Sequence, residues 1–203
     1  MTDGSGPRIA PLPRAEWGDD VRAALTTGFS ADAADRFMAT GADEIPVPNV
    51  VGTLMHHPAL AGPFLAYNAV LLRRPVLDPR VRELAVLRVA SRTGCEYEWA
   101  QHVRMATAAG VTADEVGAIA DDRGASWSAF DAAVLAAADE LVDGYRVGDA
   151  TWQVLASQLD ERQLVELVFV VGTYAGLAMA FNSFGLELDA DPTPATTPAR
   201  SDR

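Results

Sequence analysis

The fold is decided by residues 79–102, which read PRVRELAVLRVASRTGCEYEWAQH. Asp78 and Pro79 form a helix start, because aspartate accepts hydrogen bonds from free backbone amides and proline needs no donor at the first helical position. We therefore expect a helix from Pro79 to about Arg92. Thr93 and Gly94 should end it, so that the chain turns back in a helical hairpin.

The second helix of this hairpin is expected from about Cys95 to Ala109. Gly110 can take the left-handed backbone conformation that terminates helices. Thr112 and Glu115 then form a capping box, which predicts a short helix through about Ile119.

The rest of the chain also favours helices. No alternation of apolar and polar residues typical of a strand persists anywhere in the sequence. We predict an all-α helical bundle built around this hairpin. A further helix is expected at 15–25, and two short helices, broken before Pro58, are expected between Val50 and Leu72. One more helix should follow Ser128, and another should follow the capping box of Asp160 with Gln163. Gly28 to Asn49 is predicted as a loop with a short helix near Phe37.

The expected domain organisation has three parts. Residues 1–14 form an extended lead-in, 15–188 form a single helical domain with its core motif at 71–120, and 189–203 form a disordered tail poor in large apolar groups. Arg82 to Leu87 is echoed by Val165 to Val170, so two related helical units are a further possibility.

Composition limits the kinds of partner. Acidic residues number 28 against 16 basic, a formal net charge of −12, which repels phosphate backbones and anionic membrane surfaces. The single cysteine cannot form an intrachain disulfide, and the first residues lack the features of a secretory signal. We expect a cytoplasmic protein that binds neither nucleic acid nor membrane.

The apolar stretch from Leu164 to Phe181 approaches the length of about 18 residues that can span a bilayer. The stretch is less apolar than a typical membrane span, because it contains Glu166, several glycines, Thr173 and Tyr174. A buried helix or a subunit interface is therefore the expected role, and a homo-oligomer (dimer, trimer or hexamer) is the expected assembly.

Candidate chemistry gathers on one face of the second hairpin helix. Cys95, Glu98 and His102 lie three and four residues apart, so they share that face with Trp99. A carboxylate and an imidazole on an otherwise apolar face suit acid–base catalysis. Across the hairpin, Glu83 is expected to face His102 and hold its imidazole.

A purely structural interpretation competes with this one. Glu98 and His102 also form an ordinary i,i+4 pair, and Cys95 is by itself more typical of a buried small hydrophobe. His56 and His57 lack companions at metal-ligand spacing, and no zinc pattern, phosphate loop or serine elbow occurs, so no metal or cofactor is expected.

The motif of residues 82–90 followed by 93–102 resembles the core motif of carboxymuconolactone decarboxylase and AhpD-like alkylhydroperoxidase proteins. The resemblance implies an all-helical homo-oligomer with active sites near the hairpin. In the AhpD-like peroxidases a glutamate, a Cys-x-x-Cys pair and a histidine form a thiol-based proton relay. Glu83, Cys95 and His102 match three of those positions, whereas Glu98 stands where the second cysteine would be.

This departure orders the functional hypotheses. A carboxylate cannot attack peroxide or close a disulfide, so the first hypothesis is a decarboxylase-like acid–base enzyme for a carboxylated lactone or similar acid. In this hypothesis, His102 transfers the proton, Glu83 orients the imidazole of His102, and Glu98 shapes the site. The substrate is expected to contact Tyr97, Trp99 and Arg88, the last supplying positive charge. A one-cysteine peroxidase or thiol redox protein using Cys95 is second, and a non-catalytic helical oligomer is third.

Overall fold

The computed structural model describes residues 6–41, 45–121 and 127–190, and the described residues form helices without strands. The all-α prediction is confirmed. After a single 3-10 turn, Arg14–Glu16, the helices are α1 (Asp19–Gly28), α2 (Ala31–Met38), α3 (Asn49–Leu54), α4 (Pro58–Arg73), α5 (Pro79–Thr93), α6 (Glu96–Ala108), α7 (Ala113–Ala120), α8 (Ala129–Gly144), α9 (Asp149–Ala156) and α10 (Glu161–Phe184).

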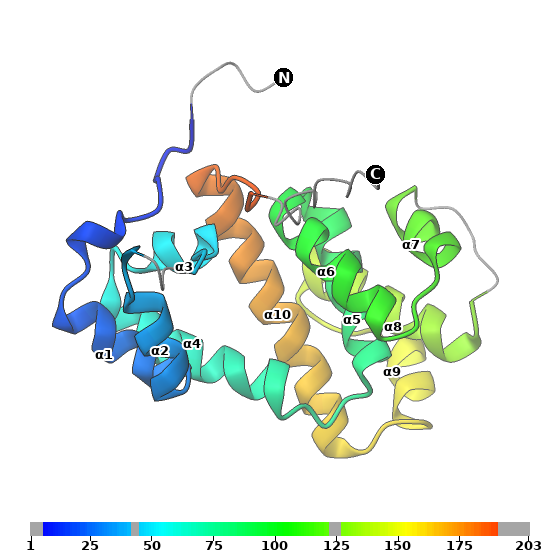
Figure 1. The fold of residues 1–203 in the computed structure, drawn as a ribbon. Coiled ribbons are helices and arrows are strands. Elements are labelled where there is room, and N and C mark those ends of the chain that lie inside the picture. The colour runs from blue at the N-terminus through cyan, green and yellow to red at the C-terminus, as the bar shows by residue number, and fades with distance from the viewer. Residues whose placement is uncertain (1–5, 42–44, 122–126, 191–203) are drawn as a thin grey trace, which may run out of the picture.

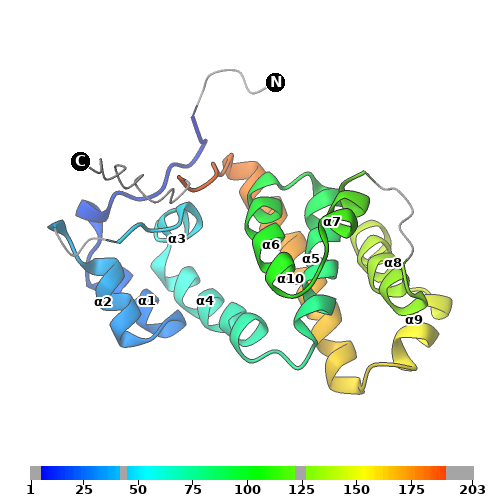
Figure 2. The same ribbon diagram turned by 45° about the vertical axis from the view of Figure 1, so that its right-hand side comes forward.

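The long helix α10 runs through the middle of the molecule, with α1 to α3 on one side and α5 to α9 on the other (Figures 1 and 2). The first side has its own apolar core, which includes Leu25, Met55 and Leu65. There α1 and α4 pack so closely that a Cβ atom added to Gly28 of α1 would lie 2.2 Å from the Cβ atom of Leu65 in α4. Glycine, which has no Cβ atom, permits this approach. The chain therefore builds two packed regions that face each other near α10.

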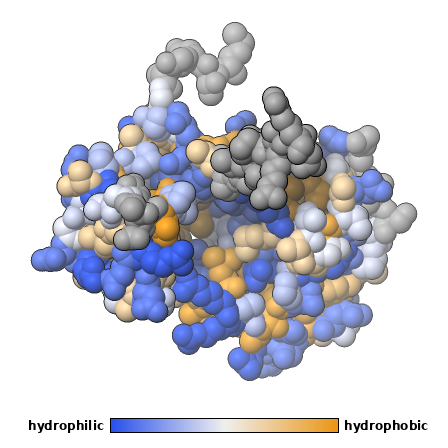
Figure 3. All heavy atoms as spheres, viewed as in Figure 1, coloured by the Kyte–Doolittle hydropathy of each residue, from blue (hydrophilic) through white to orange (hydrophobic). Residues whose placement is uncertain are grey.

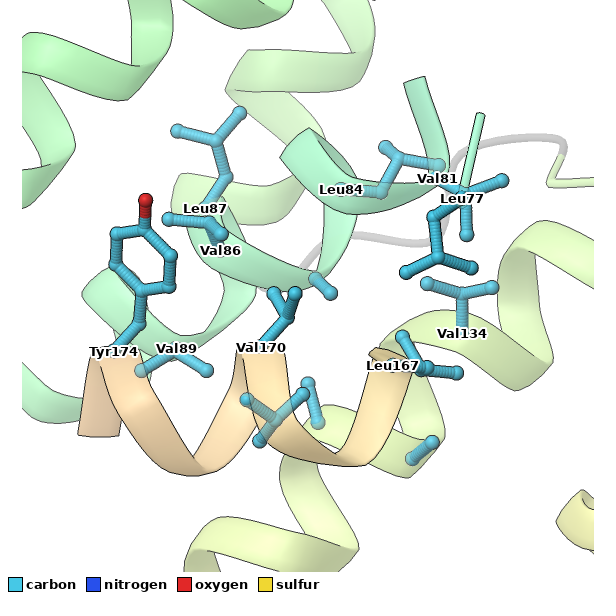
Figure 4. Packing of buried hydrophobic residues seen from close by; sticks show 14 of the residues in the cluster. Leu77, Val81, Leu84, Val86, Leu87, Val89, Val134, Leu167, Val170 and Tyr174 are labelled. Carbon is cyan, nitrogen blue, oxygen red and sulfur yellow. The ribbon is translucent and has the colours of Figure 1, made fainter. Parts of the chain in front are cut away.

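Helix α5 is the centre of the larger core. It packs against α6, α8 and α10, and its residues from 81 to 90 are all buried. Figure 4 shows Val86 and Val89 of α5 beside Val170 and Tyr174 of α10. A charged residue within this segment has no access to bulk water and needs a protein partner.

The helix ends follow the sequence signals. The Asp78 side chain accepts a hydrogen bond from the Arg80 backbone at the start of α5, and Gly94 ends that helix with φ 62°. The predicted capping boxes are present at Thr112 with Glu115 and at Asp160 with Gln163. These local hydrogen bonds fix the hairpin and the register of α10.

Three details differ from the sequence-based expectations. The segment predicted mainly as a loop contains the two-turn helix α2, capped by Ser30. The region after Ser128 holds two helices, with the break marked by Tyr145 at φ 59°. Asp189, assigned to the disordered tail, instead accepts hydrogen bonds from Asn49, Tyr97 and Gln101. The remainder of the predicted tail, from residue 191, lies outside the described residues.

Helix α10 is the one helix in the described ranges that is long and apolar enough to cross a membrane by length and composition alone. In its most apolar window 44% of the residues are buried inside the protein. The buried side contacts α5 and α8, as expected for a core helix. Val165, Phe169 and Met179 on the opposite side are more than half exposed.

Candidate functional site

The turn at Gly94 brings α5 and α6 together so that Glu83 faces His102. The Nδ1 atom of His102 lies 2.7 Å from Oε2 of Glu83, and both side chains are buried. The predicted contact across the hairpin is therefore present. A buried hydrogen bond between an imidazole and a carboxylate is strong and fixes the orientation of the ring.

Arg82 completes this pair, although sequence reasoning did not single it out. Its Nε donates to Oε1 of Glu83 at 2.8 Å, and its Nη2 lies 2.8 Å from the same oxygen. The guanidinium is itself buried. The signal in the sequence was an arginine adjoining a glutamate within a run of core residues, since such a buried charge requires a partner.

The Glu83 contact determines which nitrogen of His102 is available. When the imidazole is neutral, its Nδ1–H donates to Glu83, so Nε2 carries the free lone pair and can accept a proton. The Tyr174 ring packs edge-on against the imidazole, with 4.8 Å between centroids. Burial first, and then the charge of Glu83, raises the pKa of the Tyr174 hydroxyl, so Tyr174 stays neutral.

Glu98 lies one helical turn before His102 and is only 2% exposed. Neither carboxyl oxygen has a hydrogen-bond partner of ordinary geometry among the described residues. Burial raises the pKa of Glu98 to about 8, and the adjacent Cys95 thiol offsets part of this rise. At neutral pH, Glu98 is therefore mostly a neutral carboxylic acid that can donate a proton.

Cys95 stands at the start of α6 and is 1% exposed. Burial and the negative charge of Glu98 raise the pKa of its thiol to about 12. The thiolate is the nucleophilic form of cysteine, so Cys95 is held in its unreactive form at neutral pH. Cys95 and Glu98 interact, as their shared helix face predicted: the charge of Glu98 disfavours the Cys95 thiolate, whereas the Cys95 thiol stabilises the Glu98 carboxylate.

A pocket of about 280 Å³ opens beside these residues, between the two packed regions. Glu98, His102 and Tyr174 line one wall, and α4 contributes Asn68. Most of the remaining wall is apolar, including Phe29, Leu54, Phe64, Leu65, Leu72, Leu177 and Phe181. An apolar pocket with a few convergent polar groups is the usual form of a small-molecule site.

The predicted substrate contacts are only partly brought to this pocket. Tyr97 lines it, and its hydroxyl donates to Asp189 at 2.8 Å. Trp99 packs against the large apolar core instead. Arg88 forms a two-point ion pair with Asp139, 2.7 and 2.8 Å long, on the α8 side of α5. The prediction that Arg88 supplies positive charge to the pocket is therefore wrong, because its helical position points it away.

The remaining polar candidates have structural contacts. His57 caps α4 by accepting a hydrogen bond from the Leu60 backbone, and His56 contacts the Ala10 carbonyl. Tyr67 bonds Thr173. No group of three or more His, Cys, Asp or Glu side chains in the described part of the chain is arranged to hold a metal ion.

Residues 58–141 match the model of the carboxymuconolactone decarboxylase family. The match covers α4 to most of α8 and includes Glu83, Cys95, Glu98 and His102. No curated protein matches the sequence. The matched segment thus includes the hairpin and the candidate site residues on it.

Solved structures share the fold. An uncharacterized peroxidase-related protein from Silicibacter sp. TM1040 superposes with a TM-score of 0.70 at 17% identity, covering 94% of this chain and 96% of that one. The alkylhydroperoxidase AhpD core protein from Ralstonia eutropha JMP134 gives 0.69 at 20% identity, covering 90% and 93%. The debrominase Bmp8 gives 0.64 at 17% identity, covering 90% and 92%. At these identities the likeness concerns the fold.

Proposed function

We propose that this protein, whose residues 58–141 match the carboxymuconolactone decarboxylase family and whose fold is AhpD-like, is a small-molecule acid–base enzyme whose chemistry is proton transfer. The observation that carries this proposal is the 2.7 Å hydrogen bond between Glu83 and His102 beside a pocket that Glu98 also lines. The site thus holds a potential base and a potential acid next to each other.

The two groups have different environments and therefore different roles. His102 is oriented by Glu83 and presents Nε2 as the base. Glu98 is a neutral acid at neutral pH because burial disfavours its carboxylate. Titratable groups whose surroundings separate their protonation states form a working acid–base pair. Arg82 and Glu83 are positioning residues, since they act through the imidazole.

On a substrate with a carbonyl group, His102 and Glu98 would catalyse the formation of an enol. His102 Nε2 removes a proton from the carbon next to the carbonyl, and the electron pair of the broken C–H bond forms a C=C bond. The carbonyl π pair takes the proton of Glu98, which yields an enol. Return of a proton from His102 to the same carbon uses the C=C electron pair, the enol O–H proton returns to Glu98, and the C=O bond re-forms, which restores both groups and lets solvent hydrogen enter the substrate.

Decarboxylation of a carboxylated lactone is a narrower form of the same chemistry. Loss of carbon dioxide leaves an electron pair that becomes an enolate, and a proton from Glu98 or His102 neutralises it. Such a substrate carries a negative charge, and no arginine lines the pocket among the described residues. Proton transfer on an uncharged carbonyl compound therefore fits the site better.

Exchange of carbon-bound hydrogen in heavy water tests the proposed function directly. Cyclic ketones and carboxylated lactones would be incubated with the protein, and NMR would follow exchange next to the carbonyl while carbon dioxide release is recorded. We expect exchange with the wild type and a loss of roughly 10²- to 10⁴-fold in His102→Gln. His56→Gln, which makes the same chemical change at an exposed histidine outside the pocket, is the matched control. Equal rates in the wild type and His102→Gln would disprove the assignment.

A one-cysteine peroxidase is the alternative, and the peroxidase-related proteins of the same fold favour it. The thiolate sulfur would then attack one peroxide oxygen and break the O–O bond, which releases water or an alcohol and leaves a sulfenic acid that an external thiol reduces. The burial of Cys95 and its raised pKa oppose this reaction in the described conformation. Peroxide consumption that is lost in Cys95→Ser would establish it.

The assembly is also a proposal. Val165, Phe169, Gly172, Gly176 and Met179 are exposed and follow one stripe of α10. A Cβ atom at either glycine would contact nothing, so a second helix could approach closely there. Figure 3 shows hydrophobic surface among the hydrophilic residues of one face. We propose a cytoplasmic homo-oligomer; if it proves to lack activity in every assay above, the non-catalytic interpretation gains support.

A further inference from the structure

Three buried polar atoms without an ordinary hydrogen bond belong to two residues that line the pocket. They are both carboxyl oxygens of Glu98 and Oδ1 of Asn68, and they make up three of the four buried side-chain nitrogen and oxygen atoms without a hydrogen bond in the described ranges. Both residues line the pocket, one from α6 and one from α4. Buried polar groups are nearly always hydrogen-bonded, so this cluster indicates a ligand that supplies the missing partners.

The charges around the pocket disfavour an anionic ligand. None of its described lining residues is an arginine, and the chain contains no lysine. The nearby guanidinium of Arg82 is occupied by Glu83. Asp189 at the pocket wall is negative and is already bound by Asn49, Tyr97 and Gln101. An anion would lose its hydration without gaining a cation.

The remaining requirements concern size and hydrogen bonding. An apolar cavity of about 150 Å³ binds benzene, so about 280 Å³ suits a molecule of roughly twice that size. Asn68 Oδ1 can only accept a hydrogen bond, whereas a neutral Glu98 has an O–H to donate and an oxygen that accepts. A hydroxyl group on the ligand both donates and accepts, and therefore matches the two residues together.

We propose that this pocket binds an uncharged, mainly apolar molecule of about two fused rings, whose hydroxyl or enol group hydrogen-bonds with Glu98 and Asn68. The inference deepens the proposed function and rests on it in one respect, since an enol at this position is the product of the proton transfer described above. Carboxylated ligands of the same size are excluded from tight binding.

Three probes with the same ring system test the inference. 2-Naphthol carries the hydroxyl and is uncharged at neutral pH, 2-naphthoate carries a carboxylate, and naphthalene carries neither. Titration of the full-length protein, followed by fluorescence and calorimetry, should give 2-naphthol an affinity at least about tenfold above each of the others. Binding of 2-naphthoate as tight as that of 2-naphthol, or no binding of any probe, would overturn the inference.

A substitution locates the binding to the polar cluster. Glu98→Leu keeps the side-chain size while removing both oxygens, so it should lower 2-naphthol affinity by about tenfold and leave naphthalene affinity unchanged. Leu60→Ala, at an exposed position of α4 outside the pocket, should change neither. An unchanged preference for 2-naphthol in Glu98→Leu, with folding verified by circular dichroism, would show that the hydroxyl binds elsewhere and would refute the assignment.

Binding and catalysis can fail separately. His102→Gln should still bind 2-naphthol, because the hydroxyl partners are Glu98 and Asn68. It should no longer catalyse the exchange of carbon-bound hydrogen in the substrate. Selective 2-naphthol binding in a wild type that catalyses no exchange would contradict the proposed function and leave the ligand class intact. Exchange activity together with a preference for 2-naphthoate would contradict the proposed ligand class and leave the proposed function intact.

Discussion

Glu83 and His102 are nineteen residues apart in the chain, yet Oε2 of the one lies 2.7 Å from Nδ1 of the other. Arg82 holds the opposite oxygen of the same carboxylate. This chain of buried contacts fixes the imidazole at the pocket wall. It also means that a change at Glu83 alters both the catalytic group and the charge balance of the core.

Glu83→Gln should reduce both activity and stability. The amide can still contact His102, but it no longer neutralises Arg82 or stabilises a protonated imidazole. We expect a loss of hydrogen exchange on the order of 10²-fold or more. Removal of one partner of a buried ion pair should also lower the free energy of unfolding by about 3 kcal/mol.

Exchange rates and urea denaturation measure these two effects. Glu161→Gln, which makes the same chemical change on the exposed first turn of α10, is the control. If the two variants behave alike, the buried pair has no special role.

Glu98 should make the protein less stable as the pH rises. Its folded-state pKa of about 8 lies above the ordinary glutamate value of 4.5, so between these pH values the folded protein retains a proton that the unfolded chain has released. The free energy of unfolding should then fall by up to about 1.4 kcal/mol for each pH unit from about 5 to about 8, and level off above that.

Comparison with Glu98→Gln isolates this contribution, because every other titrating group is common to both proteins. Chemical denaturation at a series of pH values would supply the curves. The difference between them should decrease through the stated window. A constant difference would mean that Glu98 is ionised in the folded protein at neutral pH.

Cys95 should react slowly with thiol reagents in the folded protein. The thiol is buried, and its pKa of about 12 leaves almost no thiolate near pH 8. Labelling with iodoacetamide, followed by mass spectrometry, should be much slower than in urea-unfolded protein. Rapid labelling of the native protein at pH 7 would instead favour the peroxidase alternative.

The stripe on α10 predicts the assembly. If two copies meet there, the solution mass should be a multiple of 21.5 kDa, and Phe169→Asp should lower it by placing a charge in the contact. Light scattering coupled to gel filtration measures both masses. Leu60→Asp, on an exposed apolar position of α4, serves as a control for general surface effects. A monomeric wild type would refute the oligomer proposal.

The sequence by itself determined the hairpin and most of the helices. Helix limits depend on local hydrogen bonds, so Asp78, Gly94, the Thr112–Glu115 pair and the Asp160–Gln163 pair could be interpreted correctly from their neighbours in the chain. The facing of Glu83 and His102 followed from the same information, because one tight turn joins their helices. The family resemblance rests on this segment as well, and the match at residues 58–141 confirms it.

Only the tertiary structure decided what surrounds that face. Asn68 reaches the pocket from α4, Asp189 closes its edge, and Arg88 turns to Asp139, because these contacts join segments far apart in the sequence. The protonation of Glu98 and Cys95 was equally hidden, since it depends on how far the folded protein buries both side chains. Residue identity supplied the chemical groups, and burial determined which of them hold protons.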